Sequence, residues 1–230
     1  MDDMRLRLKT KGEIKVNVNA VCKCLREKYA DNEPIFMSEI SILVKDEALV
    51  KRAMKLLLDE GSLKRYDKGI YYFPRKSIFR SGSTLNIYDV IKKKYLVNNN
   101  KRCGYVSGLL LANQLGLTTQ LPSVYEVYSN LATTDFRNRM IAGYRIILRK
   151  PRVPVTDDNV DILRLLDLLK DVVTISELND EDLRNQLFKY LNKKRIDVNK
   201  MKQYLPNYPE RIYKNMYKVG LLNVIFAQRI

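Results

Sequence analysis

The chain has 230 residues and a mass of 26.9 kDa, which suits one large domain or two smaller ones. Its 42 Lys and Arg residues outnumber its 26 Asp and Glu residues, and the resulting net charge of +16 favours an anionic partner, most simply a nucleic acid. The absence of His excludes His-based acid–base catalysis, Ser-His and Cys-His nucleophile pairs and most zinc sites.

The cysteines and the apolar residues indicate the cellular compartment in which the protein is expected. Cys22, Cys24 and Cys103 are odd in number and lack the spacing of a disulfide framework, so we expect a reducing cytoplasm. Cys22 and Cys24 are two residues apart on a predicted helix and therefore point in different directions, which disfavours a metal pair. No stretch approaches the roughly 18 apolar residues of a membrane span, so we expect no membrane partner.

The first 76 residues predict three helices followed by a hairpin. Apolar residues recur at helical spacing from Ile14 to Tyr29. Ser38 is expected to cap a short second helix. Asp46 is expected to cap a longer third helix, which Gly61 ends.

The hairpin is predicted directly after this third helix. The runs LKRY at 63–66 and IYYF at 70–73 are β-prone, and the Asp67-Lys68-Gly69 turn between them carries Gly where positive φ is needed. Three helices and a hairpin in this order are the layout of a winged helix-turn-helix.

The rest of the chain predicts a small α+β unit and then helices. Helices are expected over LNIYDVIKKKYL and VSGLLLANQLG, and strands over 124–130, 136–142 and 144–150. Further helices are expected near VDILRLLDLLKDV, EDLRNQLFKYLNKK, DVNKMKQYL and PERIYKNMYKVG. The predicted fold class is therefore α+β, with a winged helix-turn-helix domain at 1–76, a second domain at 84–230 and a sub-boundary near 150–158.

A winged helix-turn-helix places its third helix in the major groove of DNA, where base edges can be read. The hairpin then meets the adjacent phosphate backbone. The residues expected to contact DNA are Lys45, Lys51, Arg52 and Lys55 at the helix and Lys64, Arg65 and Lys68 on the hairpin. Basic residues on an exposed helix are also a common solvated surface, and such domains also serve as protein-interaction modules.

A second basic patch is predicted in the middle segment. It could extend the DNA footprint, face an RNA or remain a solvated surface. Within each strand, alternation would put Arg137 with Arg139, and Arg145 with Arg149, on one side. The patch comprises Lys101, Arg102, Arg137, Arg139, Arg145 and Arg149.

No catalytic or metal-binding residue is predicted, and no cofactor is expected. Gly104, Gly108 and Gly116 do not have the spacing of a phosphate-binding loop. Asp157, Asp158 and Asp161 form an acidic cluster of the kind a two-metal nuclease uses, but the dipole at a helix start also favours carboxylates. We therefore expect a protein that is not an enzyme.

The sequence also resembles a known family. Residues 35–74, above all EGSLKRYDKGIYYFP, look like the winged-helix region of AbiEi-like antitoxins of type IV toxin–antitoxin systems, which act in abortive infection. The segment GYVSGLLLANQLGLTTQLPSVYEVYSN and the tail from about Leu187 to Phe226 are similar to the parts that follow in that group.

The resemblance implies a transcriptional autoregulator and an antitoxin in one chain. The first domain would bind double-stranded DNA at inverted repeats in its own promoter and repress its operon. The remainder would counteract a nucleotidyltransferase-like toxin without a stable complex. The alternatives are a stand-alone winged-helix regulator with a C-terminal sensing or dimerisation domain and, less favoured, a nucleic-acid-modifying enzyme.

Overall fold

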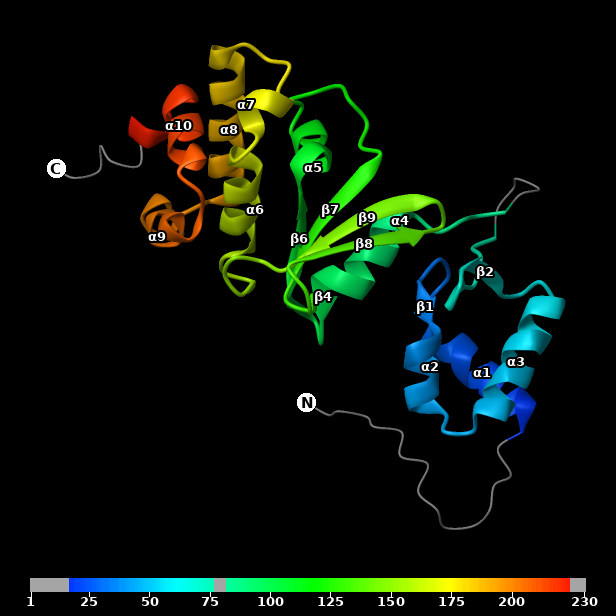
Figure 1. Ribbon diagram of the computed structural model, residues 1–230. Helices are drawn as coiled ribbons and strands as arrows, with labels where there is room; N and C mark the ends of the chain where they lie inside the picture. The colour runs from blue at the N-terminus through cyan, green and yellow to red at the C-terminus, as the bar shows by residue number, and fades with distance from the viewer. Residues whose placement is uncertain (1–16, 77–81, 224–230) are drawn as a thin grey trace. The chain divides into compact units, whose positions relative to one another are not determined.

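The computed structural model describes residues 17–76 and 82–223. It is a mixed α+β protein, as the sequence predicts (Figure 1). The chain divides into two compact units, Met1–Leu85 and Asn86–Ile230. In the described residues, no helix is long and apolar enough to cross a membrane.

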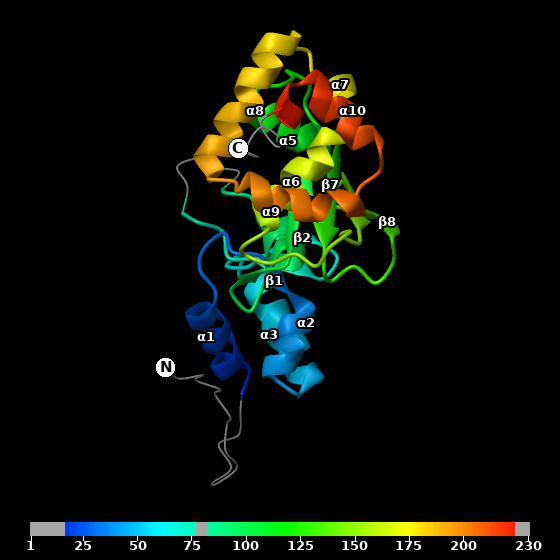
Figure 2. The ribbon, with the colours of Figure 1, turned by 90° about the vertical axis from the view of Figure 1, so that its left-hand side faces the viewer.

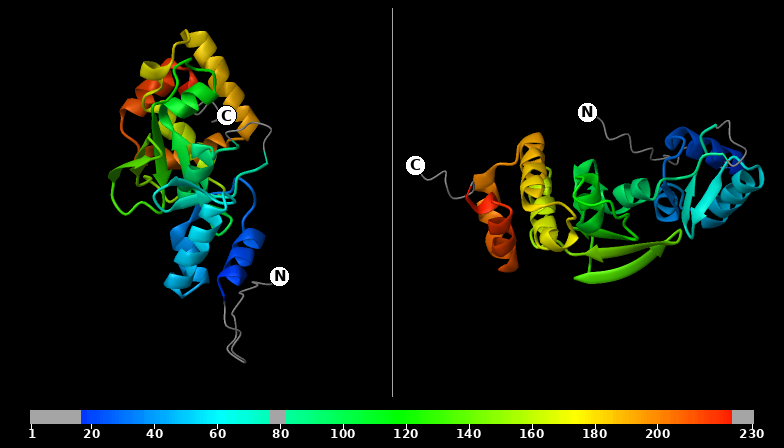
Figure 3. Two further views of the ribbon diagram at one scale, coloured as in Figure 1. Left: turned by 90° about the vertical axis from the view of Figure 1, so that its right-hand side faces the viewer. Right: turned by 90° about the horizontal axis from the view of Figure 1, so that it is seen from above.

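In its described residues, 17–76 and 82–85, the first unit contains three helices and a small sheet (Figure 3). Its sheet has the order β1-β3-β2, and both pairings are antiparallel. The elements, in chain order, are α1 (Val18–Lys28), β1 (Ile35–Phe36), α2 (Met37–Leu43), α3 (Glu47–Asp59), β2 (Lys64–Asp67) and β3 (Ile70–Tyr72).

The core of the first unit forms where apolar helix faces meet the sheet. Helix α1 packs on α3 because each has an apolar stripe at helical spacing. The buried face of α3 is centred on Val50, Ala53, Met54 and Leu57, whereas Leu49 and Leu56 are only half-buried. The other buried members are Val21, Leu25, Tyr29, Ile35, Ile40, Leu63 and Phe73.

Of the two predicted helix caps, the structure contains the one at Asp46 but not the one at Ser38. Asp46 caps α3 as expected, because its carboxylate accepts a hydrogen bond from Leu49 N at 3.0 Å. The prediction for Ser38 is wrong: Ser38 lies inside α2, which starts directly from β1. No side chain caps this helix, but Met37 N donates to Gly69 O in the hairpin at 3.0 Å, so the neighbouring turn satisfies one N-terminal donor.

Helix α1 starts at Val18, four residues after the first residue of the predicted apolar stripe. Asn17 caps it through a hydrogen bond from Ala20 N at 2.9 Å. Ile14, the first residue of the predicted stripe, lies outside the described residues, as do residues 77–81 of the predicted first boundary and the end of the tail segment beyond residue 223.

The second unit is built on a four-stranded sheet of order β6-β7-β9-β8. Strands β7 and β9 pair in parallel, and the other two pairings are antiparallel, so β8 is an edge strand. The strands are β6 (Gly104–Ser107), β7 (Val124–Ser129), β8 (Phe136–Ile141) and β9 (Tyr144–Arg149), with a separate pair β4 (Val97–Asn98) and β5 (Lys101–Arg102).

Helices lie on both sides of this sheet. The π-helical turn contacts β6 and β7, and Figure 2 shows the later helices grouped together on the side of the unit that faces the viewer. The helices are α4 (Ile87–Ile91), the π-helical Lys92–Leu96, α5 (Gly108–Gln114), α6 (Val160–Leu169), α7 (Val172–Ile175), α8 (Asp180–Lys194), α9 (Val198–Tyr204), the 3₁₀ turn Leu205–Asn207 and α10 (Arg211–Lys218).

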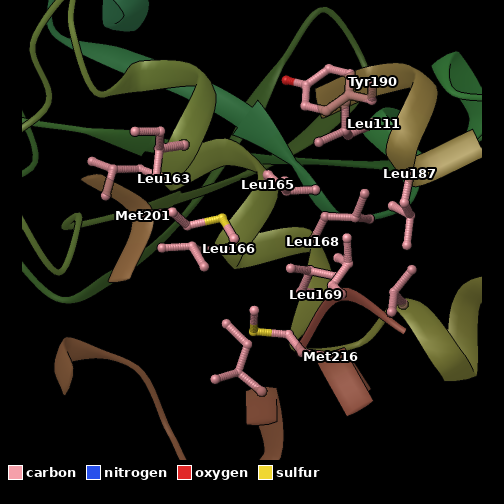
Figure 4. Packing of buried hydrophobic residues seen from close by; sticks show 14 of the residues in the cluster. Leu111, Leu163, Leu165, Leu166, Leu168, Leu169, Leu187, Tyr190, Met201 and Met216 are labelled. Carbon is pink, nitrogen blue, oxygen red and sulfur yellow. The ribbon is translucent and has the colours of Figure 1, made fainter. Parts of the chain in front are cut away.

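Helix α6 is the centre of the second unit. It contacts β6, α5 and α10, and eight of its ten residues are buried. Figure 4 shows its leucines surrounded by Leu187, Met201 and Met216 from the later helices. One apolar cluster thus extends from Tyr105 to Leu221, and residues on both sides of 150–158 share it.

The same helix carries a buried ion pair. Lys170 Nζ lies 2.6 Å from Asp167 Oδ1 and donates to the Tyr128 hydroxyl at 2.9 Å. The other carboxylate oxygen of Asp167 accepts hydrogen bonds from the hydroxyls of Tyr105 and Tyr208. Burial, followed by the Asp167 charge, raises the pKa of Tyr105, Tyr128 and Tyr208, so these hydroxyls remain neutral.

Candidate nucleic-acid interface

The exposed side of α3 carries the predicted cations. Lys51, Arg52 and Lys55 are all exposed on the side opposite the buried face, because Lys55 follows Lys51 by four residues and Arg52 by three. Lys51 Nζ lies 3.6 Å from Glu47 Oε2, an exposed pair that contributes little to stability. Ala48 is exposed on the same side, and its small side chain leaves room for a partner to approach.

Lys45 is exposed immediately before the N-terminus of α3. The first turn of this helix already holds two carboxylates, because Asp46 caps it and Glu47 is its first residue. At this end a phosphate would therefore be met by the Lys45 side chain rather than by the N–H that Asp46 already occupies.

The hairpin separates its three predicted cations. Lys68 is exposed in the turn, where Gly69 has a φ of +75°. Lys64 and Arg65 are consecutive in β2 and so point to opposite faces of the small sheet. Arg65 Nε donates to Asp67 O at 3.3 Å, which directs the guanidinium toward the turn.

The side chains of Asn32 and Tyr72 help to hold the chain beyond the hairpin, and the Tyr72 hydroxyl donates to Ser83 O at 3.1 Å. Asn32, with a φ of +59°, accepts hydrogen bonds from Arg75 N at 3.1 Å and from Ser83 Oγ at 2.7 Å. Arg75 and Lys76 are exposed here and add two cations that sequence reasoning missed. The sequence contains a signal for them, because the basic pair Arg75-Lys76 comes immediately after Pro74, where the predicted hairpin ends.

The second predicted basic patch is divided between two faces of a sheet. Arg137 and Arg139 share one face of β8, as expected from alternation, and Arg145 and Arg149 share one face of β9. Arg145, however, pairs directly with Met140, so the β9 arginines lie on the face opposite to Arg137 and Arg139. The four arginines therefore form two separate pairs.

Lys101 and Arg102 lie elsewhere, exposed on β5. Asp157 accepts a hydrogen bond from Arg102 N at 3.1 Å. Asp161 lies 3.2 Å from Lys194 Nζ, so the predicted acidic cluster is engaged in separate contacts. Across residues 17–76 and 82–223, no group of three or more Cys, Asp or Glu side chains is placed to hold a metal ion.

Two exposed apolar side chains accompany the β9 arginines. Phe136 and Met140 on β8 are 51% and 62% exposed, and the Arg149 guanidinium lies 5.2 Å from the centre of the Phe136 ring. Arg145 Nε donates to Asn138 Oδ1 at 3.2 Å on the same face. Interleaved cations and rings of this kind can stack with unpaired bases.

In the first unit, the exposed face of α3 therefore carries Lys51, Arg52 and Lys55, while Lys45 lies before this helix and Lys64, Arg65 and Lys68 lie on the hairpin. No protein-family model matches the chain, and a search of curated proteins finds no match.

Proposed function

We propose that the first unit is a winged helix-turn-helix domain that binds double-stranded DNA. The observation that carries this proposal is the cationic exposed face of α3, formed by Lys51, Arg52 and Lys55 on the side opposite its buried residues. A single helix fits the major groove, and these side chains are long enough to reach base edges and phosphates.

The element order supports the same proposal. A strand precedes α2, and an antiparallel hairpin follows α3 and closes the three-stranded sheet. With α3 in the groove, Lys68 and Arg65 on the hairpin are assigned to the flanking phosphate backbone. Exposed Ala48 is assigned to close approach, and its methyl group suits apolar contact with thymine.

The wider role proposed is that of a transcriptional autoregulator and antitoxin of a type IV system, acting against a nucleotidyltransferase-like toxin. This part rests on the resemblance of residues 35–74 and 104–130 to AbiEi-like antitoxins. The alternative is a stand-alone regulator whose second unit senses a ligand or dimerises. A nucleotidyltransferase-like gene in the same operon favours the antitoxin, and its absence favours the stand-alone regulator.

The test is a triple charge reversal, Lys51→Glu, Arg52→Glu and Lys55→Glu. All three side chains are exposed, so the fold is expected to survive. Affinity for DNA from upstream of the gene should fall to the level for scrambled DNA, a loss of roughly a thousandfold or more for a specific binder. Electrophoretic mobility shift measures the affinity, and circular dichroism checks the fold.

A matched control carries the same change of charge away from α3: Lys23→Glu, Lys214→Glu and Lys218→Glu, all at exposed positions. The control should keep the preference for upstream DNA. Equal losses in the two variants would show that net charge alone drives binding. Toxin neutralisation should survive the α3 reversal, and its loss in a folded variant would contradict the assignment of neutralisation to the second unit.

A further inference from the structure

The second unit contains a cationic pocket between α5, α6 and α8, here called the α8 pocket. Its volume is about 470 Å³, within the range of roughly 300–1,000 Å³ typical of small-molecule sites. Four cations and no carboxylate line it, and Leu111 and Tyr190, both labelled in Figure 4, form part of its apolar lining. The cations are Arg164, Lys189, Lys193 and Lys194.

One side of α8 forms one wall of the pocket. Gln186, Lys189, Tyr190 and Lys193 recur at spacings of three and four residues and therefore face the same way. Tyr190 is buried, and burial is the main reason that its pKa rises to about 12. Its hydroxyl is therefore a neutral donor, and the two lysines frame an apolar surface with positive charge.

Arg164 is held in a fixed position opposite this helix. Its Nε donates to Val106 O at 2.9 Å, and its Nη2 donates to Gln114 Oε1 at 2.7 Å. A guanidinium has five N–H groups, so these bonds orient it and leave donors for a ligand. An arginine fixed in advance loses little entropy when it binds an anion.

The charge in the α8 pocket is poorly compensated. Within residues 17–76 and 82–223, Lys194 is the one of the four cations that forms an ion pair, with Asp161 at 3.2 Å. The dipole at the C-terminus of α8 favours Lys193 and Lys194, which lie in its last turn, but accounts for neither Lys189 nor Arg164.

A second hollow in the same unit has a lining with a different balance of charge. It has nearly the same volume, about 480 Å³, but three carboxylates line it alongside its cations. Arg149 lies 3.7 Å from Glu126, and Arg211 lies 3.1 Å from Asp171. The protein's own side chains thus balance much of the charge there, whereas the α8 pocket retains an excess of donors.

We propose that the α8 pocket binds a phosphorylated small molecule of the nucleotide class. The phosphates are bound by Arg164, Lys189 and Lys193, and the less polar part of the ligand lies on Leu111 and Leu115. Charge-assisted hydrogen bonds from arginine and lysine are the usual means of phosphate recognition. This site is independent of the proposed DNA binding, because it lies within the second unit alone.

The test is isothermal titration calorimetry of the full chain with ATP, inorganic tripolyphosphate and adenosine at physiological salt. ATP should bind most tightly, tripolyphosphate more weakly and adenosine weakest, because the phosphates supply most of the affinity and the ring adds apolar contact. Lys189→Glu and Lys193→Glu should each weaken ATP binding roughly tenfold or more.

Lys150→Glu is the matched control, because Lys150 is an exposed lysine that lines the second hollow. It should change the affinity for ATP less than about twofold, a difference within what an exposed charge contributes. The proposal is overturned if ATP does not bind at millimolar concentration, if adenosine binds as tightly as ATP, or if Lys150→Glu weakens binding as much as Lys193→Glu. Loss of DNA binding in the α3 variant would not affect any of these results.

Discussion

At the scale of single residues, the carboxylate of Glu177 joins two loops that are far apart in the sequence. Its carboxylate accepts hydrogen bonds from Thr119 N at 2.7 Å, from Thr119 Oγ1 at 2.9 Å and from Gln120 Nε2 at 3.1 Å. These bonds tie the segment after α5 to the start of α8. The backbone bond from Thr119, followed by the side-chain bonds, lowers the pKa of Glu177 to about 2 from an ordinary value of 4.5.

This lowered pKa predicts a pH dependence of stability. A carboxyl group whose pKa is lower in the folded state contributes stability above its unfolded pKa, and that stability is lost as the pH falls. Glu177→Gln should therefore be less stable than the natural protein at pH 7. The difference should shrink as the pH falls from about 4.5 toward about 2. Urea unfolding followed by circular dichroism at each pH measures it.

Glu210→Gln is the control, since Glu210 is exposed and none of the described hydrogen bonds uses its carboxylate. It should show little difference from the natural protein at any pH. A difference for Glu177→Gln that stays constant between pH 2 and pH 7 would show that the carboxylate's charge does not clamp the loop.

The sequence predicts features that depend on neighbouring residues better than it predicts contacts between residues far apart in the chain. The Asp46 cap and the turn at Gly69 follow from chemistry within a few residues, and both are confirmed. The contact of Met37 N with Gly69 O joins segments far apart in sequence, so nothing near Ser38 reveals that its cap is not needed. Asp167 and Lys170 likewise look like surface residues until α6 is known to be central.

At the scale of elements, the long periodic segments were predictable and the short ones were not. The strands at 124–129, 136–141 and 144–149 match their predicted runs closely. Strand β6 was missed because all four of its residues are buried, which removes alternation, and because it leads directly into α5. The parallel pairing of β7 with β9 depends on long-range packing, and it places the arginine pairs on different faces.

The division of work between α3 and the hairpin can be measured. Lys68→Ala should weaken binding to all DNA sequences alike and reduce the slope of log K against log salt by about 1, because it removes the phosphate contact proposed for Lys68. Arg52→Ala should instead reduce the preference for upstream DNA, by about 1–3 kcal/mol if it contacts a base. Fluorescence anisotropy across a salt series gives both quantities.

The comparison has a built-in control, because the two variants carry the same change of charge. If Lys68→Ala altered sequence preference and Arg52→Ala altered only the salt slope, the roles proposed for helix and hairpin would be reversed.

At the scale of the whole molecule, the two units differ in the size of their apolar cores. The first unit has a small core under an exposed basic helix, whereas the second has a larger core around α6. The sequence predicted a basic, two-part α+β chain from charge and periodicity. It could not predict the α8 pocket, because Arg164 comes together with Lys189 and Lys193 only when α6 packs beside α8.

The most direct test of the account is binding of the full chain to DNA from upstream of its own gene, compared with scrambled DNA of the same length, over a series of salt concentrations. The account predicts a preference for the upstream DNA that persists at physiological salt, with a salt slope that reports the phosphates contacted. Equal binding to both DNAs that disappears at physiological salt would contradict it, because the net charge of +16 would then act only as a general attraction for polyanions.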